Sequence, residues 1–206
     1  MKKISVFLMV AVVLSALVSS TTGWALHPGS GKKLYIDVHH LGKGNVTAEA
    51  VAEAHEKDLT TQGRYGVNFI KYWVDEKSGT VYCLSEAPNE EMVTRTHEEA
   101  HGLIPHEVHP VTSGKEVPAS GDLKYFLDIH YLGAGNVTAE AVAEAHEKDL
   151  EVQEKYGVNF INYWVDEEAG IVYCLSQAQN PGSVIHTHTE AHGLIPNQID
   201  EVITGQ

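Results

Sequence analysis

The spacing of apolar and polar residues along the chain predicts a series of six elements. Four short stretches are rich in β-branched and aromatic residues, and the first alternates apolar and polar positions, as strands do. Two longer stretches carry an apolar stripe of helical period, and Thr47 and Asn89 are suitable N-caps for them. The expected strands cover residues 34–40, 67–75, 80–85 and about 105–111, and the expected helices run from Thr47 to about Arg64 and from Asn89 to Gly102. The order of elements is βαββαβ.

The whole series occurs a second time. Residues 33–111 align without a gap with residues 124–202, at a constant offset of 91, and about two positions in three are identical. Residues 112–123, TSGKEVPASGDL, are rich in Gly, Ser, Pro and charge and are predicted to be a linker. The chain therefore contains two tandem domains.

The order βαββαβ predicts a ferredoxin-like domain of the α+β class. Both helices then cover one face of an antiparallel sheet, and the other face needs a partner. Two copies joined by a short linker can bury these faces against each other, so we expect an intramolecular pseudo-dimer. Its further oligomerisation is left open.

The N-terminus has the pattern of a secretory signal peptide. Lys2 and Lys3 precede the apolar residues 4–18, and small residues flank Trp24 ahead of a cleavage site after Ala25. We expect residues 1–25 to be removed and the mature protein to be periplasmic or secreted. The apolar run is short for a membrane span, and we expect no membrane association after cleavage.

Charge and cysteine content narrow the classes of partner. The formal net charge of −14 argues against nucleic acid, whose phosphates need a basic surface. The chain has 13 histidines, which suggests cation binding more strongly than the acidity does. Cys83 and Cys174 are too few for a disulfide scaffold. Each is expected to be a buried thiol first, a thiolate ligand second and half of a disulfide third.

Histidines and aspartates are concentrated on the predicted helices. His55 and Asp58 lie one turn apart on the first helix, and His97 and His101 are spaced i, i+4 on the second. The two helices should lie side by side, so these four side chains could converge. Three neutral imidazoles and one carboxylate suit nickel, zinc or copper. The alternative is that both histidines of the second helix lie on a solvated flank.

The letters HEEAH at residues 97–101 match the zinc-protease signature. The second copy reads HTEAH, which lacks the catalytic glutamate, and no third ligand follows on a longer helix. A protease is therefore not expected.

Another pair of polar residues lies on the first strand. Asp37 and His39 share one face, while Ile36 and Val38 share the opposite one. We expect the apolar pair to pack under the helices, and Asp37 and His39 to face the second copy as a separate site. A hydrogen-bonded buried pair is the alternative to ligation.

Several histidine positions differ between the copies. His40 aligns with Tyr131, His106 with Asn197, His109 with Asp200, and Arg95 with His186. These positions are poor candidates for a role that both copies must perform.

Four segments taken together resemble a family of small ferredoxin-like domains that includes a nickel-responsive, nickel-binding bacterial protein. They are IDVHHLG, VTAEAVAEAHEKDL, YGVNFIKYWVDEKSGTVYCLSEAP and HEEAHGLIP. The resemblance covers both copies and implies a dimer of such domains that binds nickel, for sequestration. Carried over to this sequence, the motif histidines are His39, His55, His97 and His101, matched by His130, His146, His188 and His192. The chain departs from the usual single cytosolic domain by its duplication and its export signal.

We therefore predict an exported protein that binds divalent transition metal, with nickel first and zinc or copper as alternatives, and that catalyses no reaction. The predicted metal residues are His39, His55, Asp58, His97 and His101 with their counterparts His130, His146, Asp149, His188 and His192. The alternative is a small-molecule enzyme of the dimeric α/β-barrel type, with Asp37/His39 and Asp128/His130 as acid and base between the facing sheets. A structural or partner-binding module is the third possibility.

Overall fold

The computed structural model describes residues 31–206, and the predicted series of elements occurs in them twice. The first half consists of β1 Lys33–His40, α1 Ala48–Thr61, β2 Asn68–Asp75, β3 Thr80–Ala87, α2 Glu90–Ala100 and β4 Glu107–Ser113. The second half consists of β5 Lys124–Tyr131, α3 Ala139–Tyr156, β6 Asn159–Asp166, β7 Ile171–Ala178, α4 Pro181–Ala191 and β8 Gln198–Gly205. The α+β class and the two βαββαβ halves are confirmed. The predicted signal peptide, residues 1–25, lies outside the described part of the chain.

The helices begin where the sequence predicts caps. The Thr47 Oγ1 accepts a hydrogen bond from the Ala50 N–H at 3.2 Å, and the Asn89 Oδ1 accepts one from the Met92 N–H at 3.1 Å. The second half repeats both caps at Thr138 and Asn180. None of the helices in residues 31–206 is long and apolar enough to cross a membrane.

The helices α1 and α3 end differently, although they begin alike. α1 has 14 residues and gives way to a 3-10 turn, Gln62–Arg64, whereas α3 has 18 residues. Gly63 stands in that turn, and its counterpart is Glu154, a much better helix former. α3 therefore continues to Gly157, which closes it in the left-handed conformation with φ of 64°.

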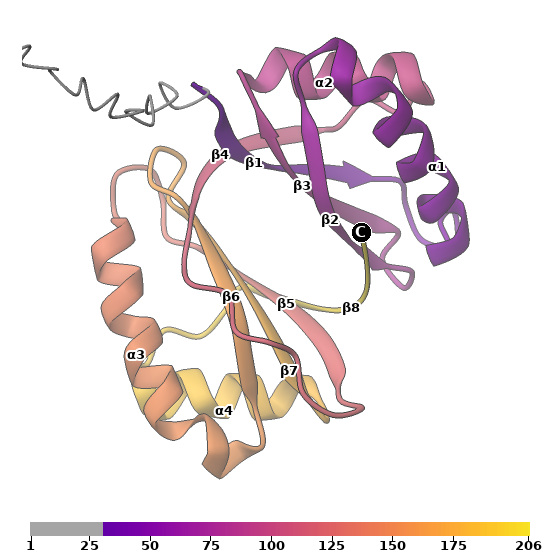
Figure 1. Cartoon of the computed structure of the whole chain (residues 1–206). Helices are drawn as coiled ribbons and strands as arrows, with labels where there is room; N and C mark the ends of the chain where they lie inside the picture. Colours follow the sequence, from indigo (N-terminus) through magenta and orange to yellow (C-terminus); the bar gives the residue numbers. More distant parts are fainter. Residues whose placement is uncertain (1–30) are drawn as a thin grey trace, which may run out of the picture. The chain divides into compact units, whose positions relative to one another are not determined.

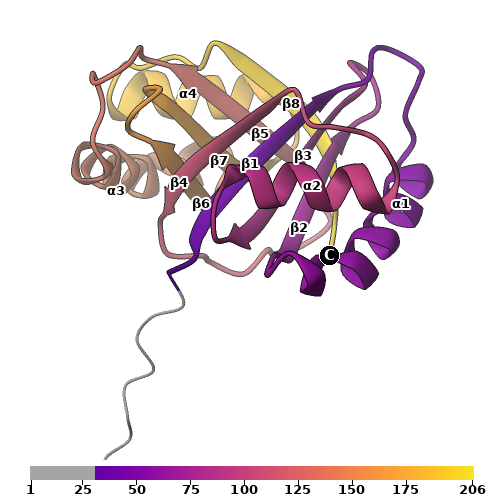
Figure 2. The same ribbon diagram turned by 90° about the horizontal axis from the view of Figure 1, so that it is seen from above.

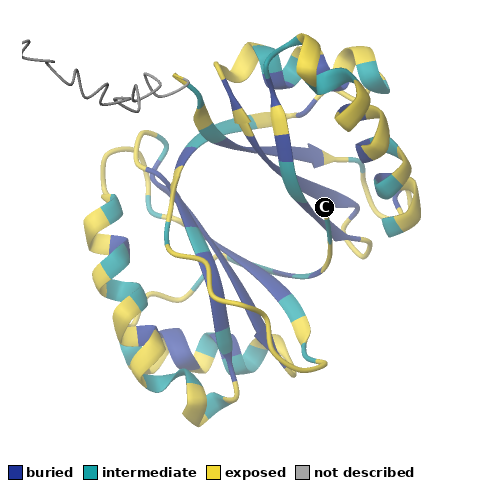
Figure 3. Cartoon of the chain, in the orientation of Figure 1, coloured by how far each residue is buried: buried dark blue, intermediate teal, exposed yellow. Residues whose placement is uncertain are grey.

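In each half, two helices cover one face of a four-stranded antiparallel sheet. α1 and α2 lie over the strands β1 to β4, and α3 and α4 lie over β5 to β8 (Figures 1 and 2). Their outward faces are exposed, whereas the strands are largely buried (Figure 3). Each sheet places the first strand between the third and fourth strands of its half.

The last strand of each half pairs with the second strand of the other, so the eight strands close into a barrel. β8 pairs with β2, and β4 pairs with β6 through Thr112↔Val165 and Ser113↔Trp164. The strand expected to end at residue 111 therefore runs two residues into the predicted linker, where its backbone finds partners on the other half. The Val117 N–H also donates to the Ile161 carbonyl at 2.8 Å. The tandem halves fit the predicted intramolecular pseudo-dimer.

One apolar cluster joins the two sheets. Trp73 and Trp164 meet near its centre, with ring centroids 5.0 Å apart, and both are almost completely buried. The cluster contains residues of both halves, among them Ile36, Val38, Tyr82, Leu84, Leu127, Ile129, Tyr173 and Leu175. Apolar packing between the sheets thus joins the halves together with the strand pairs that close the barrel.

Candidate metal centre

Two carboxylates and two imidazoles meet beneath the helices of the first half. Asp37 comes from β1, Asp58 from α1 and His97 from α2, and His101 is the residue at which α2 ends. The His97 Nδ1 lies 3.1 Å from the Asp58 Oδ1, and its Nε2 lies 3.2 Å from the Asp37 Oδ1. The His101 Nε2 lies 3.2 Å from the same Asp58 oxygen and 3.1 Å from the His97 Nδ1. His97 is therefore bracketed by two carboxylates.

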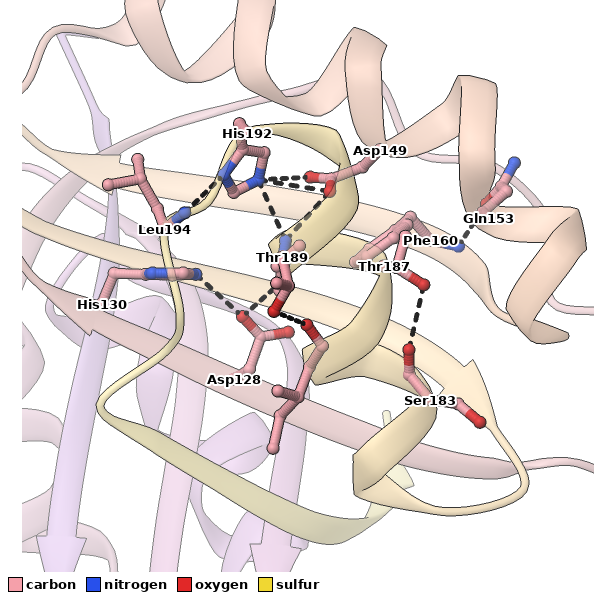
Figure 4. Close-up of polar contacts among 12 residues, drawn as sticks. Asp128, His130, Asp149, Gln153, Phe160, Ser183, Thr187, Thr189, His192 and Leu194 are labelled. Carbon is pink, nitrogen blue, oxygen red and sulfur yellow. Dashed lines mark hydrogen bonds and ion pairs between the residues drawn. The ribbon is translucent and has the colours of Figure 1, made fainter.

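The second half repeats this arrangement. The His188 Nδ1 lies 3.0 Å from the Asp149 Oδ1, and its Nε2 lies 3.2 Å from the Asp128 Oδ1. The His192 Nε2 lies 3.2 Å from the Asp149 Oδ1 and 3.1 Å from the His188 Nδ1. Figure 4 shows His192 turned toward Asp149, and His130 turned toward Asp128 on the strand below. The equivalent distances in the two halves agree within about 0.1 Å.

The structure corrects the predicted orientation of the first strand. Asp37 and His39 face the helices: the His39 Nε2 lies 3.1 Å from the Asp37 Oδ1, and its ring packs edge-on against His97 at 4.9 Å. Ile36 and Val38 point the other way, into the cluster between the sheets. Alternation determines which residues share a face but not which face meets the helices. The two predicted sites are therefore parts of one cluster.

This orientation also removes the predicted acid and base from the space between the sheets. Apolar side chains fill that space, while Asp37/His39 and Asp128/His130 lie on the opposite side of their strands. The predicted placement of these acid–base pairs between the facing sheets is therefore wrong.

Both cysteines are free and buried in the same two clusters. Cys83 is the register partner of Asp37, and Cys174 that of Asp128, so each faces the helices with its aspartate. The first expectation, a buried thiol, is confirmed, and the third, a disulfide, is wrong, because the thiols belong to different halves and lie on the helix-facing sides of their sheets. Burial, together with the nearby aspartates, raises the pKa of both thiols well above its usual value, so both are protonated.

His55 and His146 lie beside these clusters without joining their ion pairs. His55 is 5% exposed and packs against Tyr72, with ring centroids 4.8 Å apart. Its buried Nε2 has no hydrogen-bond partner in the described residues, and burial lowers the pKa of this imidazole. His146 packs against Tyr163 in the same way, and its pKa is lowered by burial as well. The expected convergence of four helical side chains therefore holds for three of them in each half.

A small cavity adjoins each cluster. It measures about 110 Å³ in the first half and about 140 Å³ in the second. Apolar side chains from the strands and from the first helix of each half make up most of its wall. In the first half the polar part of the wall comprises His39, Asn45, His55, Asp58, Cys83, His97 and His101. Each cluster can therefore be reached from a partly apolar space.

The opposite charges in the cluster stabilise the charged forms of its histidines and aspartates. Burial alone would favour neutral His97, but the charges and hydrogen bonds of Asp37 and Asp58 outweigh it and raise the pKa of His97 to about 10. Burial likewise opposes ionisation of Asp37 and Asp58, and the contacts with histidine reverse this and lower the pKa of both. His188 has a pKa raised to about 10 for the same reasons. At neutral pH each half thus holds an imidazolium between two carboxylates. His97 and His188 are also 1% exposed, so the prediction that they lie on a solvated helix flank is wrong.

Two sets of metal-ligating atoms share this cluster in the first half. One consists of Asp58, His97 and His101, and the other of Asp37, His39, Cys83 and His97; in each set the atoms lie within 4.8 Å of one another. The second half has the corresponding sets Asp149, His188, His192 and Asp128, His130, Cys174. The Oδ2 atoms of Asp37 and Asp128 are buried without a hydrogen-bond partner among the described residues. Unsatisfied buried carboxylate oxygens of this kind are compatible with a bound cation.

The set Asp58, His97 and His101 has the arrangement of a metal centre in which a further carboxylate, here Asp37, orients a ligating histidine. One ring nitrogen of a metal-ligating histidine usually contacts a carboxylate while the other binds the ion. His97 has this arrangement, with Nε2 on Asp37 and Nδ1 beside Asp58 and His101. Sequence reasoning missed the contribution of Asp37 and Cys83 to the cluster. The signal was available, because Asp37 shares a strand face with His39.

The fold and the site define a tandem α+β protein with one buried histidine–carboxylate cluster in each half. Residues 35–111 and 126–202 each match the family described as nickel responsive protein SCO4226-like, and the chain belongs to this family. The family assignment and the clusters together support a metal-related function.

The solved structures that are similar to this chain differ widely in sequence identity to it. The crystal structure of SCO4226 from Streptomyces coelicolor A3(2) is 39% identical over 43% of this chain and 99% of that protein, with a TM-score of 0.36. An anthrone oxidase-like protein is 11% identical over 86% of this chain and 94% of its own, with a TM-score of 0.45. A heme-binding protein from Thermus thermophilus is 12% identical over 85% and 91%, with a TM-score of 0.40. Among curated proteins, no sequence matches this chain.

Proposed function

We propose that the protein binds divalent nickel at one centre in each half, formed by Asp58, His97 and His101 and by their counterparts Asp149, His188 and His192. The observation that carries this proposal is the close approach of one carboxylate and two imidazoles within 4.8 Å, in the same geometry twice. Nitrogen and oxygen donors of this kind suit nickel, with zinc and copper as competitors. Membership in a nickel-responsive family favours nickel among the three.

The chemistry of binding follows from the contacts of the two imidazoles. His97 would ligate through Nδ1 and keep its Nε2 proton for Asp37, which holds the ring in place. The His101 Nδ1 accepts the Leu103 N–H at 3.2 Å, so in this arrangement its Nε2 carries the proton. Ligation through Nε2 therefore requires His101 to change tautomer and release the Leu103 N–H. Metal and protons compete for one site, because the metal replaces positive charge already held between the carboxylates.

We further propose that the protein is exported and sequesters the metal without catalysing a reaction. This rests on the signal-like residues 1–25 and on the depth of the centres, where His97 is 1% exposed. A buried ion exchanges slowly, as storage requires. N-terminal sequencing of the protein from its native compartment tests export: a chain that retains residues 1–25 in the cytosol would contradict it.

Isothermal titration of the mature chain with nickel tests the centres. Asp58→Asn with His101→Gln should remove one equivalent, and the same changes at Asp149 and His192 should remove another. Glu98→Thr is the matched control, because Thr189 occupies this position in the other half beside an equivalent cluster. If either double variant binds as much nickel as the unaltered chain, the assignment of that centre is overturned. Inductively coupled plasma analysis of untagged protein would identify the metal that it carries.

A second function is favoured by one observation, the small cavity beside each centre with the unpartnered Nε2 of His55 in its wall. This is the composition of a small-molecule site, apolar with a few polar groups. Ala50→Leu would fill the cavity of the first half and should abolish small-molecule binding there while leaving the nickel equivalents unchanged. NMR screening of a neutral fragment library against both proteins would detect this difference, and identical hit lists would remove the second function.

A further inference from the structure

A further group of donor atoms lies on the strands beneath each pair of helices, apart from the three side chains assigned to nickel. Asp37 and His39 are two residues apart on β1 and share its helix-facing side. Cys83 on β3 is the register partner of Asp37, so its side chain stands opposite that carboxylate on the same face. Two hydrogen-bonded strands therefore present one carboxylate, one imidazole and one thiol, and no helix has to move to bring them together.

The second half contains the same three donors. Asp128 and His130 share a face of β5, and Cys174 on β7 is the register partner of Asp128. In both halves the donor atoms of these three side chains lie within 4.8 Å of one another. His97 also belongs to this set in the first half, whereas its counterpart His188 is not a member in the second. The carboxylate, the imidazole and the thiol are thus the donors that both halves have in common.

The aspartate of each set has one oxygen to spare. The Asp37 Oδ1 lies 3.2 Å from the His97 Nε2 and 3.1 Å from the His39 Nε2. The Asp37 Oδ2 is buried and has no hydrogen-bond partner within residues 31–206, and the same is true of the Asp128 Oδ2. Both aspartates are 0% exposed. A buried carboxylate oxygen without a partner costs free energy, and a bound cation would remove that cost.

The chemistry of the donors distinguishes this set from the nickel centre. A thiolate is a soft ligand, and zinc accepts it together with imidazole and carboxylate, whereas the nickel centre offers nitrogen and oxygen alone. When zinc binds, the metal–sulfur bond replaces the sulfur–hydrogen bond of the thiol, and the proton leaves to solvent. One carboxylate and one thiolate then balance the two positive charges of the ion. A site without net charge is the form that a buried position tolerates best.

The cavity beside each centre leads to the strand donors. His39 and Cys83 are in the wall of the first cavity, and His130 and Cys174 are in the wall of the second. Zinc with three protein ligands keeps a fourth position for a water molecule. With volumes of about 110 Å³ and about 140 Å³, either cavity can hold that water. The cavities thus give an ion a route to the strand donors and room to complete its coordination.

We propose that each half has a zinc site made of one carboxylate, one imidazole and one thiolate, formed by Asp37, His39 and Cys83 and by Asp128, His130 and Cys174. These sites go beyond the function proposed above and do not depend on it, because they use different ligands. Asp37 connects the two sites of the first half, since its Oδ1 contacts His97 and its Oδ2 is free for zinc.

Cobalt chloride is the probe, because cobalt(II) takes the place of zinc and absorbs in the near ultraviolet when a thiolate binds it. Added to the reduced mature chain, it should produce this absorption, and zinc chloride added afterwards should remove it. Cys83→Ser should halve the absorption, and Cys83→Ser combined with Cys174→Ser should abolish it. An unaltered chain without the absorption, or a doubly substituted chain that keeps it, would overturn the proposal.

Variants of the nickel centres separate this proposal from the one above. Asp58→Asn with His101→Gln alters only helical donors, so the chain should keep the full cobalt–thiolate absorption while it loses one nickel equivalent. If the nickel centres do not bind at all, the absorption should still appear and should still depend on the two cysteines. Loss of half of the absorption in this variant would assign the ion to the helical donors and overturn a separate site.

A measurement on the unaltered chain covers the case in which a variant does not fold. X-ray absorption at the zinc K edge, on the chain loaded with two equivalents of zinc, should show sulfur neighbours at about 2.3 Å together with nitrogen and oxygen neighbours at about 2.0–2.2 Å. A hydrogen-bonded histidine–aspartate pair beside an inert thiol would give nitrogen and oxygen neighbours alone. That result would also overturn the proposal.

Discussion

The two halves of the chain have nearly the same buried centre but different residues at the exposed end of the first strand. In the centres, His97 and His188 contact the same two carboxylates at closely matching distances, although Glu98 beside one of them is Thr189 in the other half. At the strand end, an imidazole–carboxylate cluster of His40, Glu107 and His109 occupies the first half. Asp200, at the position that corresponds to His109 in the second half, instead accepts a hydrogen bond from Tyr82 of the first half. The comparison shows that the two centres keep the residues that point under the helices, whereas positions on the other face of the first and last strands differ between the halves, half-exposed His40 and buried Asp200 alike.

The largest expected effect concerns the core that the halves share. Trp73→Ala and Trp164→Ala should each destabilise the protein by about 3–5 kcal/mol, because each leaves a cavity in the cluster between the sheets. Chemical denaturation should give one transition for both variants, since the barrel joins the halves. Ile203→Ala, at a side chain that is 48% exposed, is the control and should cost less than about 0.5 kcal/mol. Two separate transitions would mean that the halves fold independently.

The next effect tests whether the centres are equivalent. His97→Ala leaves Asp37 and Asp58 buried without their cation, which should cost about 3–5 kcal/mol of unfolding free energy, and His188→Ala should cost the same. Each variant should also lose one nickel equivalent. Denaturant unfolding without metal measures the first quantity and titration the second. A large difference in unfolding free energy between the two metal-free variants would show that the two centres stabilise the protein unequally despite their matching distances.

The pH dependence follows from the raised pKa of His97 and His188, about 10 in each half. In the metal-free protein the stability from these ion pairs is fully present below the unfolded value of about 6.5 and is lost as the pH rises through about 10. Nickel must displace these protons, so its affinity should rise about tenfold per pH unit for each proton released, from pH 6.5 upward. Nickel titrations at several pH values, each in two buffers, measure the affinity and the number of protons released. An imidazole with an ordinary pKa would weaken binding only below about pH 6.5, so an affinity that is constant above that pH would contradict the raised pKa of His97 and His188.

The smallest effect concerns the helix ends. Gly63→Glu reproduces Glu154 of the longer helix and should stabilise the protein by about 0.5–1 kcal/mol. Gly63 has no positive φ, and a Cβ added there meets nothing within 4 Å. Thermal unfolding of the metal-free protein would measure the gain, with Glu154→Gly in the second half as the reverse change. If both changes are destabilising, the difference in helix length has a cause other than propensity.

Local pattern was enough to predict the elements, their order and their duplication. Strand alternation and the caps at Thr47 and Asn89 depend only on neighbours along the chain. The duplication follows from comparing the letters of residues 33–111 with those of residues 124–202, so neither needs coordinates. The i, i+4 spacing of His97 and His101 likewise predicted that these two imidazoles approach each other, as they do at 3.1 Å. The pairing of Asp58 with them followed from the expected side-by-side helices.

Only the tertiary structure decided which face of β1 meets the helices. The sequence shows that Asp37 and His39 are on one face and Ile36 and Val38 on the other, but both faces of this strand are covered. The choice depends on the apolar cluster between the sheets, which takes Ile36 and Val38 together with side chains from the other half, about 90 residues away along the chain. The same packing brings Asp37 to His97 and Asp166 to His109. Contacts between residues so far apart in sequence depend on how the apolar side chains of both halves pack together, so they cannot be predicted from the local sequence pattern.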